Sequence, residues 1–259
     1  MKAYALHILF LGVLTIGITL LGNQISQAQI DSTSSGTSVT DITNQTQINS
    51  ESDSIPDAKY VYETGTMSLA ASVKSFIIMI PDEAHHPPED DKTISPKNPN
   101  FLPTTLEVLD GTELAFVHGD PSHTHVEILK DKDGNVAWET TPVEHPGGSD
   151  IKTLSSSGSP YSISDKEFTN MEGQINVSNE KSTGSLTVGG FFVPTKDLDQ
   201  YKSEFADAGF DVISDFGFTT ESVQKDLAGD NTLLIYSTSQ SVKDAIEKLL
   251  PIMESLPYE

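Results

Sequence analysis

The 259-residue chain contains no cysteine and no arginine. Without cysteine, the protein can form neither a disulfide nor a thiolate nucleophile, and it cannot hold a metal through a thiolate. Any metal that it binds must be held by nitrogen, oxygen or thioether ligands. Without arginine, and with 38 acidic residues against 15 lysines, the chain has a formal net charge of −23 at pH 7. This charge argues against nucleic acid as a partner, because nucleic-acid-binding surfaces are basic and favour arginine.

The first 28 residues have the pattern of an export signal rather than of a folded segment. Lys2 provides a positive start, Ile8 to Leu21 form an apolar run of fourteen residues, and Ser26-Gln27-Ala28 matches a cleavage site. We therefore expect a signal peptide over residues 1–28 and an extracellular or cell-surface protein. An uncleaved segment would instead make the membrane a partner, although the run is shorter than the roughly 18 apolar residues of a typical transmembrane helix.

Residues 29–59 are dominated by Ser, Thr, Asn, Gln and Asp, with only scattered Ile and Val. Such a segment buries too little apolar surface to order itself, so we predict a disordered polar spacer. From Tyr60 the composition changes to short apolar runs separated by turn residues. Several short strands at this spacing are typical of an antiparallel β-sandwich, which we expect over residues 60–178.

The segment 106–129 combines strand and turn signals with three of the seven histidines. Apolar residues alternate with polar ones on both sides of Asp110-Gly111, which predicts two half-buried strands joined by a turn. The residues expected to face inward are Leu106, Val108, Leu114 and Phe116.

After His118 and a short turn, a third strand is expected in which Val126 and Ile128 form the apolar phase. The other phase holds His123, His125 and Glu127. Two interpretations are open for this polar phase. The histidines bind a metal, or they are the solvent-exposed side of an edge strand.

Together with N-M-E-G-Q-I-N-V from Asn170 to Val177, these strands resemble the cupredoxin family over roughly Ala70 to Ser178. The family's G-T-x-V-x-W-x-N strand is matched in part by Gly111, Thr112, Leu114, Phe116 and His118. Its methionine followed by G-x-I-x-V is matched by Met171, Gly173, Ile175 and Val177. The resemblance implies a Greek-key β-sandwich that holds copper through two histidines, a cysteine and a weak methionine ligand.

Two of these four ligand positions are changed. Counting back from Met171, the cysteine position holds Asp165 and the second histidine position holds Phe168. The first histidine position aligns with Thr124, between two histidines. The resemblance is closer to archaeal extracytoplasmic cupredoxin-like proteins with P-D-x-A-H-H and G-D-x-x-H-x-H motifs, matched here by Pro81–His86 and Gly119–His125. It implies a degenerate copper site that cannot be a blue-copper electron-transfer centre, because such a centre needs the cysteine thiolate.

The loop 81–103 offers further nitrogen and oxygen ligands. It contains six of the fourteen prolines, together with His85, His86 and several carboxylates. Long loops in compact domains are usually functional or disordered, so a solvated loop without a role is the alternative. Imidazoles suit copper(II) and zinc, and copper(II) is bound more tightly. The candidate metal ligands are His85, His86, His123, His125 and, as a remnant of the family site, Met171.

Residues 184–259 show a β-α-β-β-α pattern, expected as a small α+β domain after a polar linker at 179–183. Thr195 and Ser241 are candidate N-caps of its two helices. No catalytic motif stands out anywhere in the chain, so we do not expect an enzyme. We expect an exported metal-binding protein on a cupredoxin-like, mainly β scaffold. The alternative is a metal-free interaction module on the same scaffold, with another cell-surface protein as its partner.

Overall fold

A computed structural model describes residues 58–61, 64–81, 100–214 and 231–257. The expected signal peptide, nearly all of the spacer and the pair His85 and His86 lie outside these residues. All described residues belong to one compact unit, Glu51–Glu259. Among the helices in the described ranges, none combines the length and apolarity that crossing a membrane requires.

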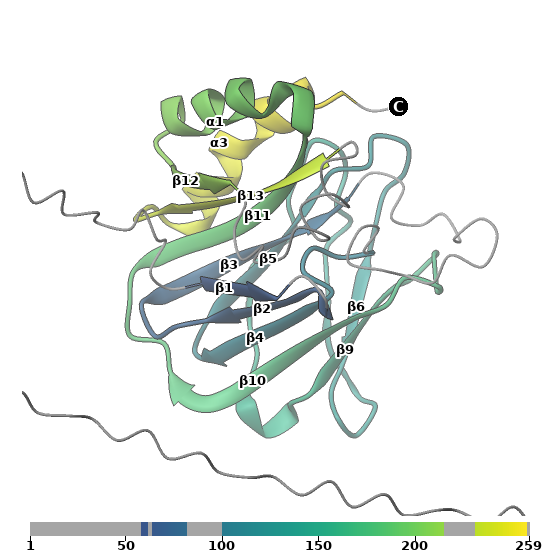
Figure 1. The fold of residues 1–259 in the computed structure, drawn as a ribbon. Coiled ribbons are helices and arrows are strands. Elements are labelled where there is room, and N and C mark those ends of the chain that lie inside the picture. Colours follow the sequence, from purple (N-terminus) through teal and green to yellow (C-terminus); the bar gives the residue numbers. More distant parts are fainter. Residues whose placement is uncertain (1–57, 62–63, 82–99, 215–230, 258–259) are drawn as a thin grey trace, which may run out of the picture. The chain divides into compact units, whose positions relative to one another are not determined.

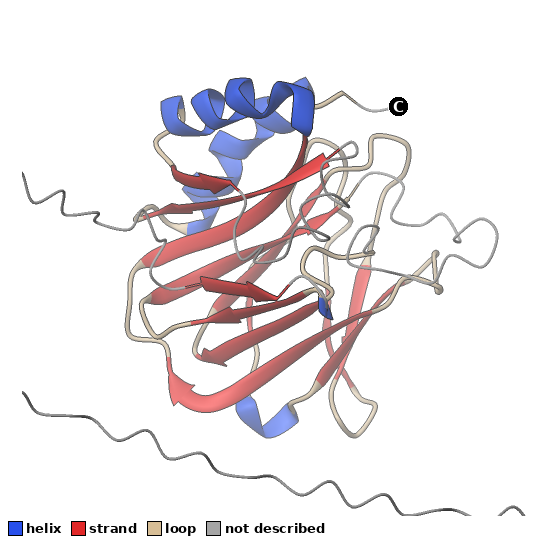
Figure 2. Cartoon of the chain, viewed as in Figure 1, coloured by secondary structure: helices blue, strands red, loops and turns tan. Residues whose placement is uncertain are grey.

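The described residues form two mixed β-sheets, and strands dominate the fold (Figure 2). The first sheet has seven strands in the order β1-β2-β4-β10-β9-β6-β7. These are β1 (Ala58–Val61), β2 (Thr66–Leu69), β4 (Thr105–Asp110), β10 (Gly173–Lys181), β9 (Tyr161–Asp165), β6 (Glu127–Lys130) and β7 (Val136–Glu139). The mainly β sandwich expected from the sequence is confirmed, but the expected antiparallel pairing is not general, because β4 pairs in parallel with both β2 and β10.

The second sheet has six strands in the order β12-β13-β11-β3-β5-β8. These are β12 (Asp211–Ser214), β13 (Asn231–Thr238), β11 (Leu186–Pro194), β3 (Val73–Ile80), β5 (Glu113–His118) and β8 (Lys152–Thr153). The helical elements of the described residues are η2 (Ser156–Gly158), η3 (Thr195–Asp197), α1 (Leu198–Asp207) and α3 (Val242–Ser255). Helix α1 contacts β11, β12 and β13, whereas α3 contacts β3, β5 and α1 (Figure 1).

The sheet pairing corrects the expected division of the chain at residue 184. The β-α-β-β-α order of the C-terminal region is present, but β11 pairs in parallel with β3, so its strands extend the second sheet of the sandwich. The polar linker expected at residues 179–183 is also held in place by strand pairing and hydrogen bonds. Residues up to Lys181 continue β10, Ser182 Oγ donates to the Val73 carbonyl at 2.6 Å, and Thr183 N–H donates to the Ala71 carbonyl at 2.8 Å.

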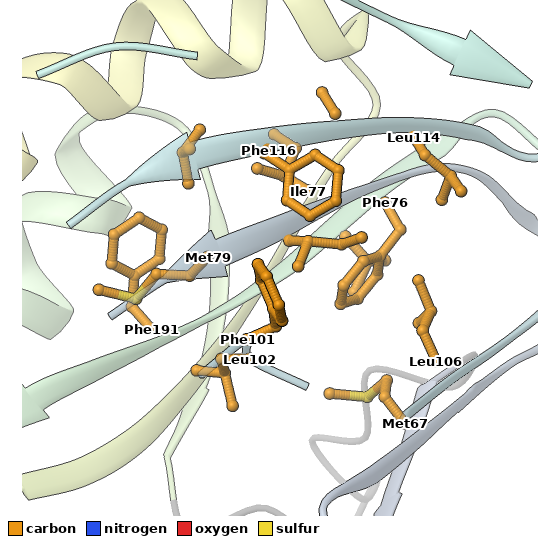
Figure 3. Packing of buried hydrophobic residues seen from close by; sticks show 14 of the residues in the cluster. Met67, Phe76, Ile77, Met79, Phe101, Leu102, Leu106, Leu114, Phe116 and Phe191 are labelled. Atoms are coloured by element: carbon orange, nitrogen blue, oxygen red, sulfur yellow. The ribbon is translucent and has the colours of Figure 1, made fainter. Parts of the chain in front are cut away.

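The apolar sequence of β3 explains why the C-terminal region is needed there. From Phe76 to Ile80 every side chain is buried, because β3 has a parallel neighbour on each side and α3 contacts it. A strand that is covered on both faces has a nearly continuous apolar sequence, in contrast to the alternation of a half-buried strand. Phe76 of β3 belongs to the buried hydrophobic cluster that includes residues of both sheets, among them Met67 and Leu106 (Figure 3). The four inward-facing residues expected in the central block are all buried.

The two α-helices begin and end largely where the sequence predicts. The Ser241 hydroxyl accepts a hydrogen bond from the Asp244 N–H at 3.2 Å, which caps α3. Gly209, at φ +87°, ends the segment after α1, where a residue with a side chain would be strained. Thr195 opens the short η3 turn instead of capping α1, whose N-cap residue is Asp197.

Candidate metal centre

Three strand ends meet where the sandwich carries its buried polar residues. β5 ends at His118, a turn follows, and His125 forms an isolated bridge with Val143 just before β6 begins. Glu127 of β6 is the direct cross-strand partner of Asp165, the last residue of β9. The side chains of His118, Asp120, His125, Glu127 and Asp165 are all buried.

His125 lies between two buried carboxylates. Its Nδ1 is 3.0 Å from Asp165 Oδ2, and its Nε2 is 3.6 Å from Asp120 Oδ2. Burial alone would lower the pKa of His125, but the hydrogen bonds with Asp120 and Asp165 outweigh it and raise this pKa to about 9. At neutral pH His125 is therefore an imidazolium in the metal-free protein.

Asp165 is held by hydrogen bonds on both of its oxygens. Oδ1 accepts the N–H groups of Glu167 and Phe168, each at 2.7 Å, while Oδ2 accepts from Val126 N–H at 3.1 Å and from His125. Burial raises the pKa of Asp165, but these donors overcome it, so the pKa lies below its usual value. Asp165 is thus a fixed, ionised carboxylate.

Glu127 is only partly satisfied by hydrogen bonds. Its Oε2 accepts from the Thr140 hydroxyl at 3.1 Å, whereas Oε1 has no hydrogen-bond partner among the described residues. Burial raises the pKa of Glu127 to about 7, although the nearby His125 acts in the opposite direction. A buried carboxylate oxygen without a donor is costly unless a proton or a cation occupies its lone pairs.

His118 is neutral. Its Nδ1 accepts the Asp120 N–H at 2.9 Å, so the proton of the neutral ring is on Nε2. Burial is the main cause that lowers the pKa of His118 to about 3, and His125 adds to it. The centroids of these two imidazole rings are 4.6 Å apart. His118 therefore adds no positive charge to the cluster.

The outer side of the cluster is formed by His123 and Phe168. Nδ1 of His123 is 3.4 Å from Asp120 Oδ2, and 39% of its side chain is exposed. The Phe168 ring lies 5.0 Å from the His123 ring and 5.3 Å from the His125 ring, measured between centroids. His145 is also close, since its Nδ1 is 2.9 Å from the His118 carbonyl oxygen.

The residues present fit a cation bound by nitrogen and oxygen. One ligand-type atom each from His125, Glu127 and Asp165 lie within 4.8 Å of one another. Within the described ranges these three form the single group of histidine and carboxylate ligands that meets this geometry. One imidazole and two carboxylates suit zinc or copper(II), and they lack the thiolate of a blue-copper centre.

The structure tests the predicted site residues unevenly. His85 and His86 lie outside the described residues, and Met171 is fully buried. The interpretation of His125 and Glu127 as a solvent-exposed phase is wrong, because both have no exposed surface. Their phase continues inward to Leu129, while Val126 and Ile128 are only half-buried.

Sequence reasoning did not assign Glu127 and Asp165 as ligands. The apolar neighbours Val126 and Ile128 suggest that they face the core, which would put Glu127 on the solvent-exposed face of the strand. Asp165 was recognised only as the residue in the cysteine position, yet it directly contacts His125. The signal in the sequence was that Asp165, a possible oxygen ligand, stands in the position where cupredoxins have the cysteine ligand.

No family model and no curated protein matches the sequence. A purple cupredoxin from Nitrosopumilus maritimus is 19% identical, with a TM-score of 0.32 over 39% of this chain and 98% of that chain. Rusticyanin from Thiobacillus ferrooxidans is 14% identical, with a TM-score of 0.32 over 47% of this chain and 87% of its own. A mutant of amicyanin is 13% identical, with a TM-score of 0.25 over 29% and 70%. Similarity at these identities and TM-scores supports no conclusion about function.

Proposed function

We propose that the protein binds a divalent transition-metal ion, copper(II) or zinc, through His125 Nδ1 and the carboxylates of Glu127 and Asp165. The observation that carries this proposal is the convergence of three buried ligand-type atoms within 4.8 Å. Glu127 and Asp165 are opposite one another on β6 and β9, where two like charges destabilise a sheet. A cation between them removes that cost.

The ligand types favour a role in metal binding rather than in electron transfer. A bound metal ion would supply a positive charge to the two carboxylates and replace the proton on His125 Nδ1. Asp165 offers hard oxygen where the family has a thiolate, so the strong electronic coupling of a blue-copper site is absent. The proposal is therefore metal storage, sequestration or delivery. An exported, cell-surface location belongs to it, supported by the signal-like N-terminus and the acidic charge.

His85, His86 and Met171, which the sequence suggested as ligands, stay part of the proposal. The chain enters the loop that contains His85 and His86 just after Ile80, whose carbonyl accepts the Gly119 N–H at 2.7 Å. This contact is next to His118, so the loop starts beside the cluster. Met171 follows Phe168 and donates its N–H to the Phe168 carbonyl at 2.9 Å.

A metal-free interaction module is the second candidate. The observation that favours it is the 3.0 Å contact between His125 and Asp165, because an imidazolium already compensates an ionised aspartate without a metal. In this case the cluster would only fix the ends of β6 and β9. The cell-surface partner would then bind elsewhere on the scaffold.

Titration calorimetry with copper(II) and with zinc tests the proposal on metal-depleted protein without a histidine tag. His125→Gln, Glu127→Gln and Asp165→Asn should each reduce the affinity by well over tenfold. Glu139→Gln is the matched control, because Glu139 is an exposed residue of β7 that pairs with Lys166 at 2.7 Å. The double variant His85→Ala, His86→Ala tests the loop in the same way. Equal affinity in wild type and the three cluster variants would place the bound metal outside the cluster, and no binding in wild type would favour the metal-free module.

A further inference from the structure

The two ring nitrogens of His125 face two different buried aspartates. Nδ1 is 3.0 Å from Asp165 Oδ2, and Nε2 is 3.6 Å from Asp120 Oδ2. A histidine that binds a cation through one ring nitrogen keeps its proton on the other. The two aspartates therefore cannot have the same role toward a cation at His125.

The position of Glu127 distinguishes the two sides of the ring. The group of converging ligand atoms contains His125, Glu127 and Asp165, and it does not include Asp120. The cation side of the ring is therefore Nδ1. The Nε2–H that remains then points to Asp120.

The turn after β5 holds Asp120 in place. Its Oδ1 accepts the Ser122 N–H at 2.7 Å, and its own N–H donates to His118 Nδ1 at 2.9 Å. Asp120 is fully buried. These two hydrogen bonds leave Oδ2 directed at His125 and at His123, which is 3.4 Å away on the exposed side.

We propose that Asp120 is a positioning residue of the metal centre, which accepts the Nε2–H of His125 and so directs Nδ1 toward Glu127 and Asp165. This inference rests on the proposed function. A carboxylate behind a ligating histidine fixes the ring orientation and raises the basicity of the ligating nitrogen. His123, expected from the sequence to be a ligand, then supports Asp120 from the solvent side and does not contact the cation.

Nitrogen-15 and proton NMR of the His125 ring, in wild-type protein with and without zinc, test the inference directly. In the metal-free protein at neutral pH, both ring N–H protons should be observed as protected resonances. On zinc binding the Nδ1–H resonance should disappear, whereas the Nε2–H resonance should remain. Loss of Nε2–H with retention of Nδ1–H would place the cation beside Asp120 and overturn the inference.

Asp120→Asn gives the second measurement. It should shift the Nε2–H resonance, leave the Nδ1–H resonance in place and weaken zinc binding by about 10–100-fold, as for other residues behind a metal ligand. Asp110→Asn is the control, because it removes one carboxylate that pairs with Lys181 where β4 ends, away from the cluster. Unchanged zinc affinity and an unchanged Nε2–H resonance in Asp120→Asn would overturn the inference.

The two proposals fail in different ways. If wild-type protein binds neither zinc nor copper(II), the proposed function fails, and the role of Asp120 toward a metal fails with it. The metal-free spectra of Asp120→Asn would then still show whether Asp120 holds the His125 ring. If zinc binds but Nε2–H is lost, only the role of Asp120 is wrong.

Discussion

Glu127 and Asp165 are direct partners across β6 and β9, and both side chains are buried on the same face of the sheet. Two carboxylates in this position repel one another unless a proton or a cation lies between them. Burial raises the pKa of Glu127 to about 7, so this carboxyl holds the proton below that pH. The ionised group is Asp165, whose pKa is lowered by its hydrogen bonds.

Glu127→Gln should stabilise the metal-free protein and weaken metal binding. The pKa of Glu127 is raised from 4.5 to about 7 in the folded state, so wild type loses stability as the pH rises through this window. Glutamine cannot ionise, so the variant should gain up to about 3 kcal/mol above pH 7 and almost nothing at pH 4. Denaturant unfolding at both pH values measures the difference. A variant that is less stable at pH 8 would contradict the assignment of a costly buried carboxylate.

The metal-free protein should lose stability between about pH 7 and pH 9. His125 has a folded pKa of about 9 against an unfolded value of 6.5, so the stability from its protonation is complete below 6.5 and is lost as the pH rises through 9. The effect should be at most about 3 kcal/mol. His125→Gln should remove the slope in this window. A parallel slope in wild type and variant would show that other groups cause it.

Metal affinity should rise with pH up to about 9. A cation at Nδ1 must displace the proton that the folded state holds with a pKa of about 9, so the apparent affinity should rise by up to about tenfold per pH unit below this value. Zinc titrations between pH 6 and pH 9 measure it. An affinity that levels off near pH 6.5 would mean that the metal does not displace a proton from His125 Nδ1.

Copper(II)-loaded wild type should show no intense blue band, because the chain has no cysteine. Asp165→Cys should introduce an intense thiolate-to-copper(II) absorption, since the replaced carboxylate lies 3.0 Å from His125 Nδ1. Glu139→Cys places a thiol on the exposed side of β7 and is the control. Identical weak spectra for both cysteine variants would mean that residue 165 does not contact the metal.

Gly189→Ala should destabilise the whole described unit. An added Cβ would lie 2.1 Å from the Tyr236 hydroxyl, whereas at Gly190 its nearest contact would be Ile235 at 3.2 Å. We expect a loss of about 1–3 kcal/mol for Gly189→Ala and less for Gly190→Ala. Trp138, the single tryptophan, is in β7 of the other sheet and reports unfolding there. If its fluorescence transition does not move in Gly189→Ala, the C-terminal region unfolds independently.

The sequence by itself determined the elements of the fold. Alternating apolar residues give β4 and β5, the Asp110-Gly111 turn is placed correctly, and the capping residues give the start of α3. These features depend on neighbours within a few residues, so local patterns suffice to predict them. The absence of cysteine likewise excludes a blue-copper centre without any structure.

The resemblance to cupredoxins also drew attention to two residues that lie beside His125. Asp165 and Phe168 were placed in ligand positions by counting from Met171, and both side chains lie against His125. The resemblance supplied this register. It did not supply the chemistry, because a carboxylate in place of a thiolate changes which partners the site needs.

Only the tertiary structure decided where the C-terminal strands lie and which side of β6 is buried. The parallel pairing of β11 with β3 joins residues more than a hundred positions apart, and no local pattern specifies such a contact. The inward phase of β6 is set by the alignment of Glu127 with Asp165, which overrides the weak preference of Val126 and Ile128 for the core. Burial of a carboxylate is unfavourable in isolation, so it becomes predictable only when the groups that compensate its charge are brought to it by the fold.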